Sequence, residues 1–183
     1  MATYNKKAHL RRNIDAIKTA FALEREQREP TGEEQERLRV YSGFGAIKEV
    51  IDTRRQAGNP PNPESMEGMF AELHEVLKAN TANEREYKQY FDSIKSSILT
   101  AFYTPEIIAH TIAQAMERTG VKAGRILDPS AGTGTFGHYQ KVMNPEAEIT
   151  YFEKDPVTGL ILKHLHPKDN VRVQGYETIE PKY

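Results

Sequence analysis

The sequence of 183 residues contains neither cysteine nor tryptophan. Without cysteine, the chain cannot build a disulfide framework or a metal site with thiolate ligands. A chain free of cysteine also fits a reducing compartment, and we expect a cytoplasmic protein.

Long apolar runs and an excess of one charge are also missing. No apolar run approaches the roughly 18 residues that a membrane-spanning helix needs, and the first residues lack the apolar core of a signal peptide. We therefore expect no membrane partner. The 25 Lys and Arg residues and 26 Asp and Glu residues leave a formal net charge of -1. No overall field then draws the chain to nucleic acid or to a lipid surface.

The first hundred residues have the periodicity of helices. Leu10, Ile14, Ile17 and Phe21 recur at helical spacing and predict a buried stripe. The other face of this helix is basic, and such a face is either solvated or available to DNA phosphates. Its basic residues are Lys6, Lys7, Arg11, Arg12, Lys18, Arg25 and Arg28.

Two local signals divide this half further. Thr31 and Glu34 have the spacing of a capping box and predict the start of a second helix. That helix should carry Leu38 and Tyr41 and stop at Ser42-Gly43-Phe44-Gly45, with Phe44 in the core. We expect a helical domain over residues 1–100, with a proline-rich linker or loop at 52–64.

The second half alternates strand and helix. Short apolar runs predict strands at 125–127, 148–153 and 171–173, with helices between them. Short connections of this kind imply parallel strands joined by right-handed crossovers. Before the first strand, Thr104 and Pro105 suit the N-cap and first position of a helix. The predicted buried face of that helix carries Ile107, Ile108, Ile112, Ala115 and Met116.

A glycine-rich turn follows the first strand. Asp128 stands at the strand end, and Pro129 cannot continue a central strand. Gly132 and Gly134 permit positive φ and leave the backbone open to a ligand. The helix after the turn directs free N–H groups towards the same place. The turn therefore predicts a binding site for a small molecule with an anionic or polar end.

An acidic residue at the end of the next strand restricts the class of ligand that the turn could bind. Glu153 can accept hydrogen bonds from a ribose diol. Asp128 suits a second polar or cationic group near the turn. The pattern Gly132-x-Gly134-x-x-Gly137 also occurs in dinucleotide sites, which keeps a nicotinamide-dependent oxidoreductase as an alternative. A carboxylate at Asp128 would repel a pyrophosphate, however, and S-adenosylmethionine has a cationic tail that suits it better.

The turn resembles the cofactor motif of the adenine-N6 DNA methyltransferases over residues 128–136. Three further stretches resemble elements of that family and occur in its order: Phe102-Tyr103-Thr104-Pro105, Phe152-Glu153-Lys154-Asp155-Pro156 and Gln174-Gly175-Tyr176-Glu177. The resemblance implies that S-adenosylmethionine is held by Phe102, Tyr103, Thr104, Pro105, Asp128, Pro129, Ser130, Ala131, Gly132, Thr133, Gly134, Phe136, Glu153, Lys154, Gly175, Tyr176 and Glu177. Lys154 departs from the family, which usually has an apolar residue there, and either Tyr176 or Glu177 takes the position of the acid that binds adenine.

The resemblance also implies a fold and a function. Residues 101–183 would form the first half of a class I, Rossmann-like methyltransferase sheet, truncated after about three strands. The parent enzyme would methylate adenine N6 in DNA, as in restriction-modification. Tyr41-Ser42-Gly43-Phe44-Gly45 is similar to a stretch in large methylase–helicase proteins of mobile elements. DNA would be a partner of the full-length protein, with attached helicase or nuclease domains.

The catalytic motif of that family, N-P-P-Y/F, has no good counterpart. Asn59-Pro60-Pro61-Asn62 lacks the aromatic residue and a preceding strand. We therefore expect no catalytic residue in this chain, which would be a fragment of a longer enzyme or a shortened homologue. His164 and His166 stand two apart, which is wrong for one helical face, and we expect no metal site. The other alternative is a non-catalytic DNA- or protein-binding module.

Overall fold

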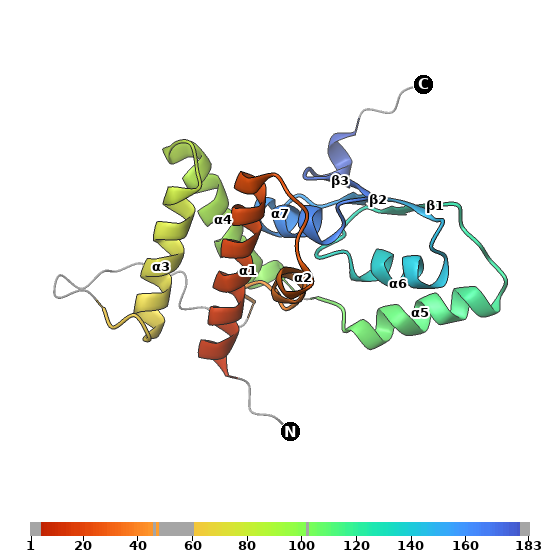
Figure 1. The fold of residues 1–183 in the computed structure, drawn as a ribbon, viewed down its shortest axis with the longest axis horizontal. Coiled ribbons are helices and arrows are strands. Elements are labelled where there is room, and N and C mark those ends of the chain that lie inside the picture. The colour runs from red at the N-terminus through yellow and green to blue at the C-terminus, as the bar shows by residue number, and fades with distance from the viewer. Residues whose placement is uncertain (1–4, 46, 48–60, 102, 180–183) are drawn as a thin grey trace. The chain divides into compact units, whose positions relative to one another are not determined.

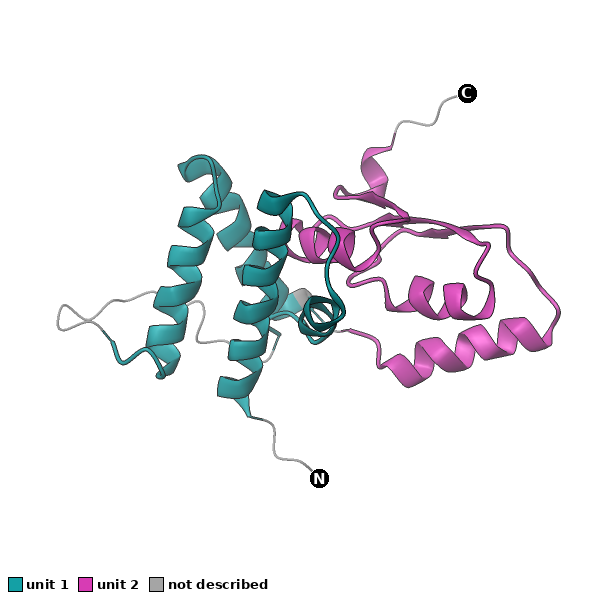
Figure 2. Ribbon diagram, in the orientation of Figure 1, with its two compact units in different colours: residues 1–102 teal, residues 103–183 magenta. Residues whose placement is uncertain are grey.

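A computed structural model describes residues 5–45, 47, 61–101 and 103–179 (Figure 1). The chain divides into two compact units, residues 1–102 and residues 103–183 (Figure 2). Phe102 and Asn59-Pro60, which the sequence singled out, lie outside the described residues. Among the described residues, no helix combines the length and the apolar character that crossing a membrane requires.

The first unit is helical. It contains α1 (Lys6–Glu26), α2 (Gly32–Arg39), α3 (Met66–Ala79) and α4 (Glu84–Thr100). Each helix begins at a side chain that accepts a hydrogen bond from the amide three residues later, and these N-caps are Asn5, Thr31, Ser65 and Asn83. α1 packs against α2 and α3, and α3 packs against α4. The predicted apolar stripe of α1 is confirmed, because Leu10, Ile14, Ile17 and Phe21 are all buried.

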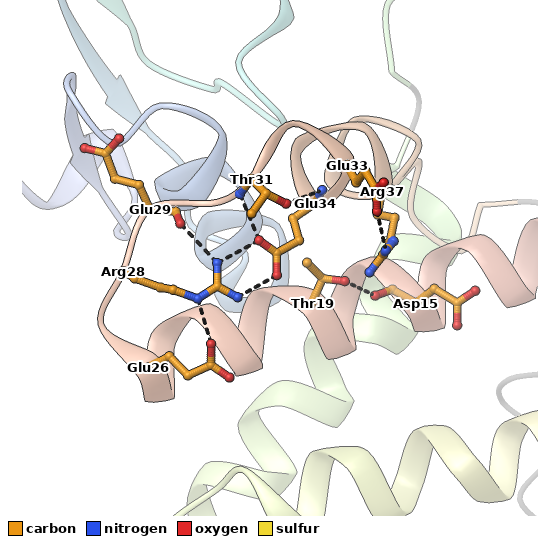
Figure 3. Close-up of polar contacts among 9 residues, drawn as sticks. All are labelled: Asp15, Thr19, Glu26, Arg28, Glu29, Thr31, Glu33, Glu34 and Arg37. Atoms are coloured by element: carbon orange, nitrogen blue, oxygen red, sulfur yellow. Dashed lines mark hydrogen bonds and ion pairs between the residues drawn. The ribbon is translucent and has the colours of Figure 1, made fainter.

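The connection between α1 and α2 is held by charged side chains (Figure 3). Thr31 and Glu34 form the predicted capping box, with the Thr31 amide 2.8 Å from a Glu34 carboxylate oxygen. The Arg28 guanidinium donates two bonds of 2.7 Å to Glu34 and one of 2.7 Å to Glu26. These bonds from Arg28 are the main reason that the pKa of Glu34 is lowered to about 2.

Intramolecular ion pairs occupy part of the basic face of α1. Arg11 and Lys18 both reach the Glu72 carboxylate on α3, at 2.7 and 3.0 Å. Arg28 is paired as described above. At least three of the seven basic residues therefore already have carboxylate partners within their own unit. This arrangement favours a structural and solvated face over one reserved for DNA phosphates.

The Tyr41–Gly45 turn packs into the helical unit. Asn13 on α1 is fully buried, donates to the carbonyl of Gly43 and accepts from the amide of Ser42 at 3.2 Å. Phe44 is also fully buried, so its predicted core position is confirmed. The His9 ring bonds the Ser42 hydroxyl at 2.7 Å. The turn is thus held by two side chains one helical turn apart on α1.

The second unit contains a small parallel sheet. Its elements are α5 (Glu106–Arg118), β1 (Arg125–Asp128), α6 (Thr135–Met143), β2 (Glu148–Phe152), α7 (Pro156–Leu165), β3 (Asn170–Arg172) and the 3-10 helix η2 (Tyr176–Thr178). The strand order is β1-β2-β3, and both pairs are parallel, which confirms the predicted strands and their direction. The described part of the chain thus has an α/β fold that is mostly helical, with a sheet of three parallel strands.

One face of this sheet carries the core of the unit. Ile149 and Tyr151 of β2 pack with Leu162 of α7 and with Ala131, and Ile126 and Val171 pack against them from the two edge strands. Figure 1 shows α6 and α7 on the same side of the sheet. That arrangement follows from two crossovers that move in the same direction across the sheet.

Two predictions about α5 are wrong. The helix begins at Glu106, one residue later than expected, because Pro105, with an extended ψ of 137°, takes the N-cap position that was expected for Thr104. Ile107, Ile108 and Ile112 were expected to be buried but are 67%, 47% and 42% exposed. The buried residues are Ala109 and Ala113, in a helix that packs against α6. Small side chains allow that close approach and leave the isoleucine face uncovered.

Candidate ligand-binding turn

The acid at the end of β2 is bound to the glycine turn that follows β1. The register pairs Asp128 with Tyr151, so the carboxyl ends of β1 and β2 lie at one edge of the sheet. One oxygen of Glu153 accepts a hydrogen bond from the amide of Gly132 at 2.8 Å. The other accepts from the amide of Asp155, also at 2.8 Å. The structure therefore brings together two of the groups that the sequence placed in one site.

The turn itself has a defined backbone. The amide of Ala131 donates to the carbonyl of Phe152 at 2.9 Å, which anchors the turn to β2. The amide of Gly134 donates back to the carbonyl of Ala131 at 2.8 Å. Gly132 has a φ of 58° and Gly134 a φ of 81°. Both values lie in the left-handed region that strongly favours glycine, as expected from the sequence.

Tyr103 forms one wall of the turn. Its ring lies so close to Gly132 that a Cβ added there would be 3.0 Å from Cε1 of the ring. The Tyr103 hydroxyl lies 3.3 Å from the Thr158 hydroxyl, at the start of α7. Burial raises the pKa of Tyr103, so the phenol stays neutral. Thr104 and Pro105 continue from this wall into α5.

Asp128 has a buried oxygen without a hydrogen-bond partner among the described residues. Its Oδ1 accepts from the amide of Ser130 at 3.2 Å, while its Oδ2 is the partnerless atom. Burial raises the pKa of this carboxyl group, and the bond from Ser130 opposes that shift. The adjacent Pro129 and Ser130 are exposed. A buried acceptor oxygen without a partner is suited to a ligand that brings a hydrogen-bond donor or a positive charge.

The segment after β3 lies beside the end of β2. The Tyr176 ring meets the Phe152 ring edge to face, with centroids 5.3 Å apart and planes at 82°. Tyr176 and Glu177 are exposed, and the Glu177 carboxylate lies against Gly175. Lys154 is exposed as well. These residues were predicted to contact the adenine of a cofactor, and that assignment stays a prediction.

Sequence reasoning missed His166. Its Nε2 lies 3.2 Å from the carbonyl oxygen of Thr133, inside the predicted turn. The spacing of His164 and His166 in the sequence gives no sign that either ring reaches the turn. The described residues contain no cluster of three residues able to hold a metal ion. Thirty-three positions separate His166 from Thr133, so no local pattern connects them. Only the packing of the end of α7 brings them together.

Comparisons with known proteins give one partial similarity. The chain is 35% identical over 81 residues to "Defense against restriction protein B" of Escherichia phage P1. The aligned stretch is 44% of this chain and 4% of that protein, so the chain spans only a small share of the relative. No family model matches the chain. No solved structure matches it either.

These findings correct the function that the sequence motifs implied. The relative is named for defence against restriction and not for methyl transfer, and no methyltransferase model matches. The prediction of an adenine-N6 DNA methyltransferase, with its role in DNA methylation and restriction-modification, is therefore wrong. The class I methyltransferase fold has no support beyond the three-stranded sheet. A strand followed by a glycine turn determines the local path of the backbone, but it does not determine which reaction, if any, takes place there.

Proposed function

We propose that the chain is a non-catalytic binding module of a protein that acts in defence against restriction. We further propose that the turn at residues 128–135 binds a nucleoside with a cationic tail, of which S-adenosylmethionine is the best-fitting example. The name of the phage relative supports the first part. The buried, partnerless Oδ2 of Asp128 is the single observation that carries the second.

Glu153 is suited to a ribose. Each of its oxygens accepts one backbone hydrogen bond, and a carboxylate oxygen has a second lone pair available. Two ribose hydroxyls could therefore add to the carboxylate without displacing the bonds that shape the turn. Burial raises the pKa of Glu153, opposed by the two backbone bonds. Hydrogen bonds to a buried charged acceptor are stronger than those between neutral groups.

The charges at this edge favour a cationic tail over a pyrophosphate. Asp128 and Glu153 place two carboxyl groups at the ends of adjacent strands. An ammonium or sulfonium group would be attracted to Asp128, whereas a pyrophosphate would be repelled. The first amides of α6 have no intrahelical acceptor and can bind the carboxylate of the same tail. DNA as a partner, and attached helicase or nuclease domains, stay predictions for a longer protein.

Calorimetry on the 183-residue chain tests the ligand class. We expect S-adenosylmethionine to bind at least about tenfold more tightly than NADH, a difference of about 1.4 kcal/mol. Mass spectrometry should recover the ligand unchanged after incubation with the chain. Equal or tighter binding of NADH, or no binding of either nucleoside, would overturn the ligand assignment. Conversion of the ligand would contradict a non-catalytic module.

The variant Asp128→Asn is expected to be more stable than the wild type but weaker in binding. The folded-state pKa of Asp128 is raised by burial, so ionisation costs stability as the pH rises through that pKa. Asparagine does not titrate. The variant should therefore be more stable than the wild type at pH 7, with a higher Tm, and should lose this advantage at pH values low enough to protonate the carboxyl group in both the folded and the unfolded state.

Unfolding curves at pH 4 and pH 7 measure this gain, and titration with S-adenosylmethionine should give an affinity about tenfold lower. The matched control is Asp92→Asn, on an exposed side chain of α4, for which neither quantity should change. A loss of stability at pH 7 in Asp128→Asn would mean that Oδ2 has a favourable partner in the free protein.

A further inference from the structure

Consecutive residues of the turn are held by side chains from two different elements. Glu153, after β2, accepts from the amide of Gly132. His166, at the end of α7, lies 3.2 Å from the carbonyl oxygen of Thr133. A carbonyl oxygen can only accept, so Nε2 of the ring must carry the proton. The Thr133–Gly134 peptide is thereby fixed at both ends, because the amide of Gly134 donates to Ala131.

The peptide that His166 holds is one that could otherwise rotate. Gly132 and Thr133 are the central residues of a turn closed by the Gly134 amide and the Ala131 carbonyl. Among described non-glycine residues, only Gln27 has a positive φ, so Thr133 follows Gly132 with a negative φ, as in a type II′ turn. Glycine on both sides of Thr133 leaves this peptide few steric restraints of its own. Rotation would reverse the direction of the Thr133 carbonyl beside the predicted ligand.

The other ring nitrogen connects His166 to the rest of the unit. Nδ1 lies 3.3 Å from the Tyr151 hydroxyl and 3.6 Å from Oδ2 of Asp169. Asp169 in turn binds the Lys141 ammonium of α6 at 2.9 Å. The side chains of His166 and Asp169 are only 10% and 8% exposed. With the proton on Nε2, Nδ1 can accept from the Tyr151 hydroxyl, which supports the ring on that side while Nε2 faces the turn.

The imidazole of His166 occupies the space that a side chain at residue 134 would need. A Cβ at residue 134 would overlap Nε2 of His166 and Cδ1 of Leu162. The shape of the turn and the position of the ring therefore depend on each other. The imidazole acts on the turn through direct contact with its backbone.

We infer that His166 is a positioning residue, which sets the nucleoside affinity of the turn by holding the Thr133–Gly134 peptide in place. The expected effect of His166 on nucleoside affinity rests on the proposed function. Its expected effect on the order of the turn in the free protein does not. Pre-ordering a binding loop raises affinity because the loop loses less freedom when the ligand arrives.

Two substitutions separate the bond to Thr133 from the packing of the ring. Glutamine at 166 can place an amide nitrogen near the position of Nε2 and keep the donor to Thr133. Asparagine is too short to do so, although both substitutions remove the ring. We expect His166→Gln to bind S-adenosylmethionine within about twofold of the wild type, and His166→Asn about fivefold more weakly. Equal weakening in both variants would overturn the inference, because packing alone would explain it.

Hydrogen exchange without ligand gives an independent result. The Gly134 amide should exchange about fivefold faster in His166→Asn than in the wild type, and at the wild-type rate in His166→Gln. If the wild type binds no nucleoside, the proposed function fails, and the exchange rates still decide the role of His166. Equal exchange in all three proteins would reject that role even where binding is found.

The wild-type protein supplies a test that needs no variant. Nitrogen-15 NMR distinguishes the two neutral imidazole tautomers, and the bond to Thr133 requires the proton on Nε2. We expect Nε2 of His166 to carry a proton. A ring protonated on Nδ1 alone could not donate to Thr133, and that result would overturn the inference even if both variants failed to fold.

Discussion

Gly134→Ala is expected to lower the free energy of unfolding by about 3 kcal/mol. Part of this loss is backbone strain of about 1 kcal/mol, because alanine at a φ of 81° lies in the left-handed region. The rest comes from overpacking, since the new methyl group would overlap His166 and Leu162. Overpacking of this kind costs about 1–3 kcal/mol. Urea unfolding followed by circular dichroism measures the difference.

Gly120→Ala is the matched control. Gly120 has a φ of 75° but nothing within 4 Å of an added Cβ. It should therefore show only the strain of about 1 kcal/mol. The double variant Gly134→Ala with His166→Ala should recover part of the excess, because the ring that causes the overlap is gone. Equal losses for the two glycines would mean that the imidazole does not occupy the space beside the turn.

The local structure of the turn could be predicted from the sequence, because its causes are local. A short apolar run followed by an acid, a proline and two closely spaced glycines leaves few conformations open. The positive φ values of Gly132 and Gly134 follow from that pattern. The approach of Glu153 to the turn also follows, because successive parallel strands end at the same edge.

Features that depend on packing could not be predicted in this way. The periodicity of α5 identified an apolar face but not whether anything covers it, and Ile107 proved to be 67% exposed. The charge count on α1 did not reveal that Glu72 pairs with Arg11 and Lys18. His166 reaches Thr133 from the far end of α7. All three depend on how elements that are distant in the sequence pack together, and local patterns do not determine that packing.

The error in function has a different origin. Residues 128–136 determine a backbone shape, and many unrelated activities use a strand, a glycine turn and a helix. Four motifs occur in the order of one family, yet no family model matches the chain, and the relative is named for defence against restriction. A ligand at this turn is therefore indicated only by the contacts of Asp128 and Glu153 themselves.

Glu153→Gln is expected to weaken the binding of S-adenosylmethionine by about 30- to 100-fold. The carboxylate now accepts from two backbone amides, those of Gly132 and Asp155. Glutamine has only one acceptor oxygen, so its NH₂ group must face one of these N–H donors. The negative charge that would strengthen the bonds to ribose is also lost, and such bonds contribute about 1.5–3 kcal/mol. Calorimetry on the wild type and the variant measures the change.

Glu148→Gln makes the same substitution at the opposite end of β2, on an exposed side chain, and should leave the affinity unchanged.

A distorted turn and a lost ribose contact would both weaken binding, and a 2′-deoxy analogue of the ligand distinguishes these two causes. The wild type should bind this analogue about tenfold more weakly than the parent ligand, because one bond to Glu153 is missing. In Glu153→Gln the two ligands should bind almost equally. If the variant still discriminated between them tenfold, another residue would recognise the ribose, and Glu153 would act only by shaping the turn.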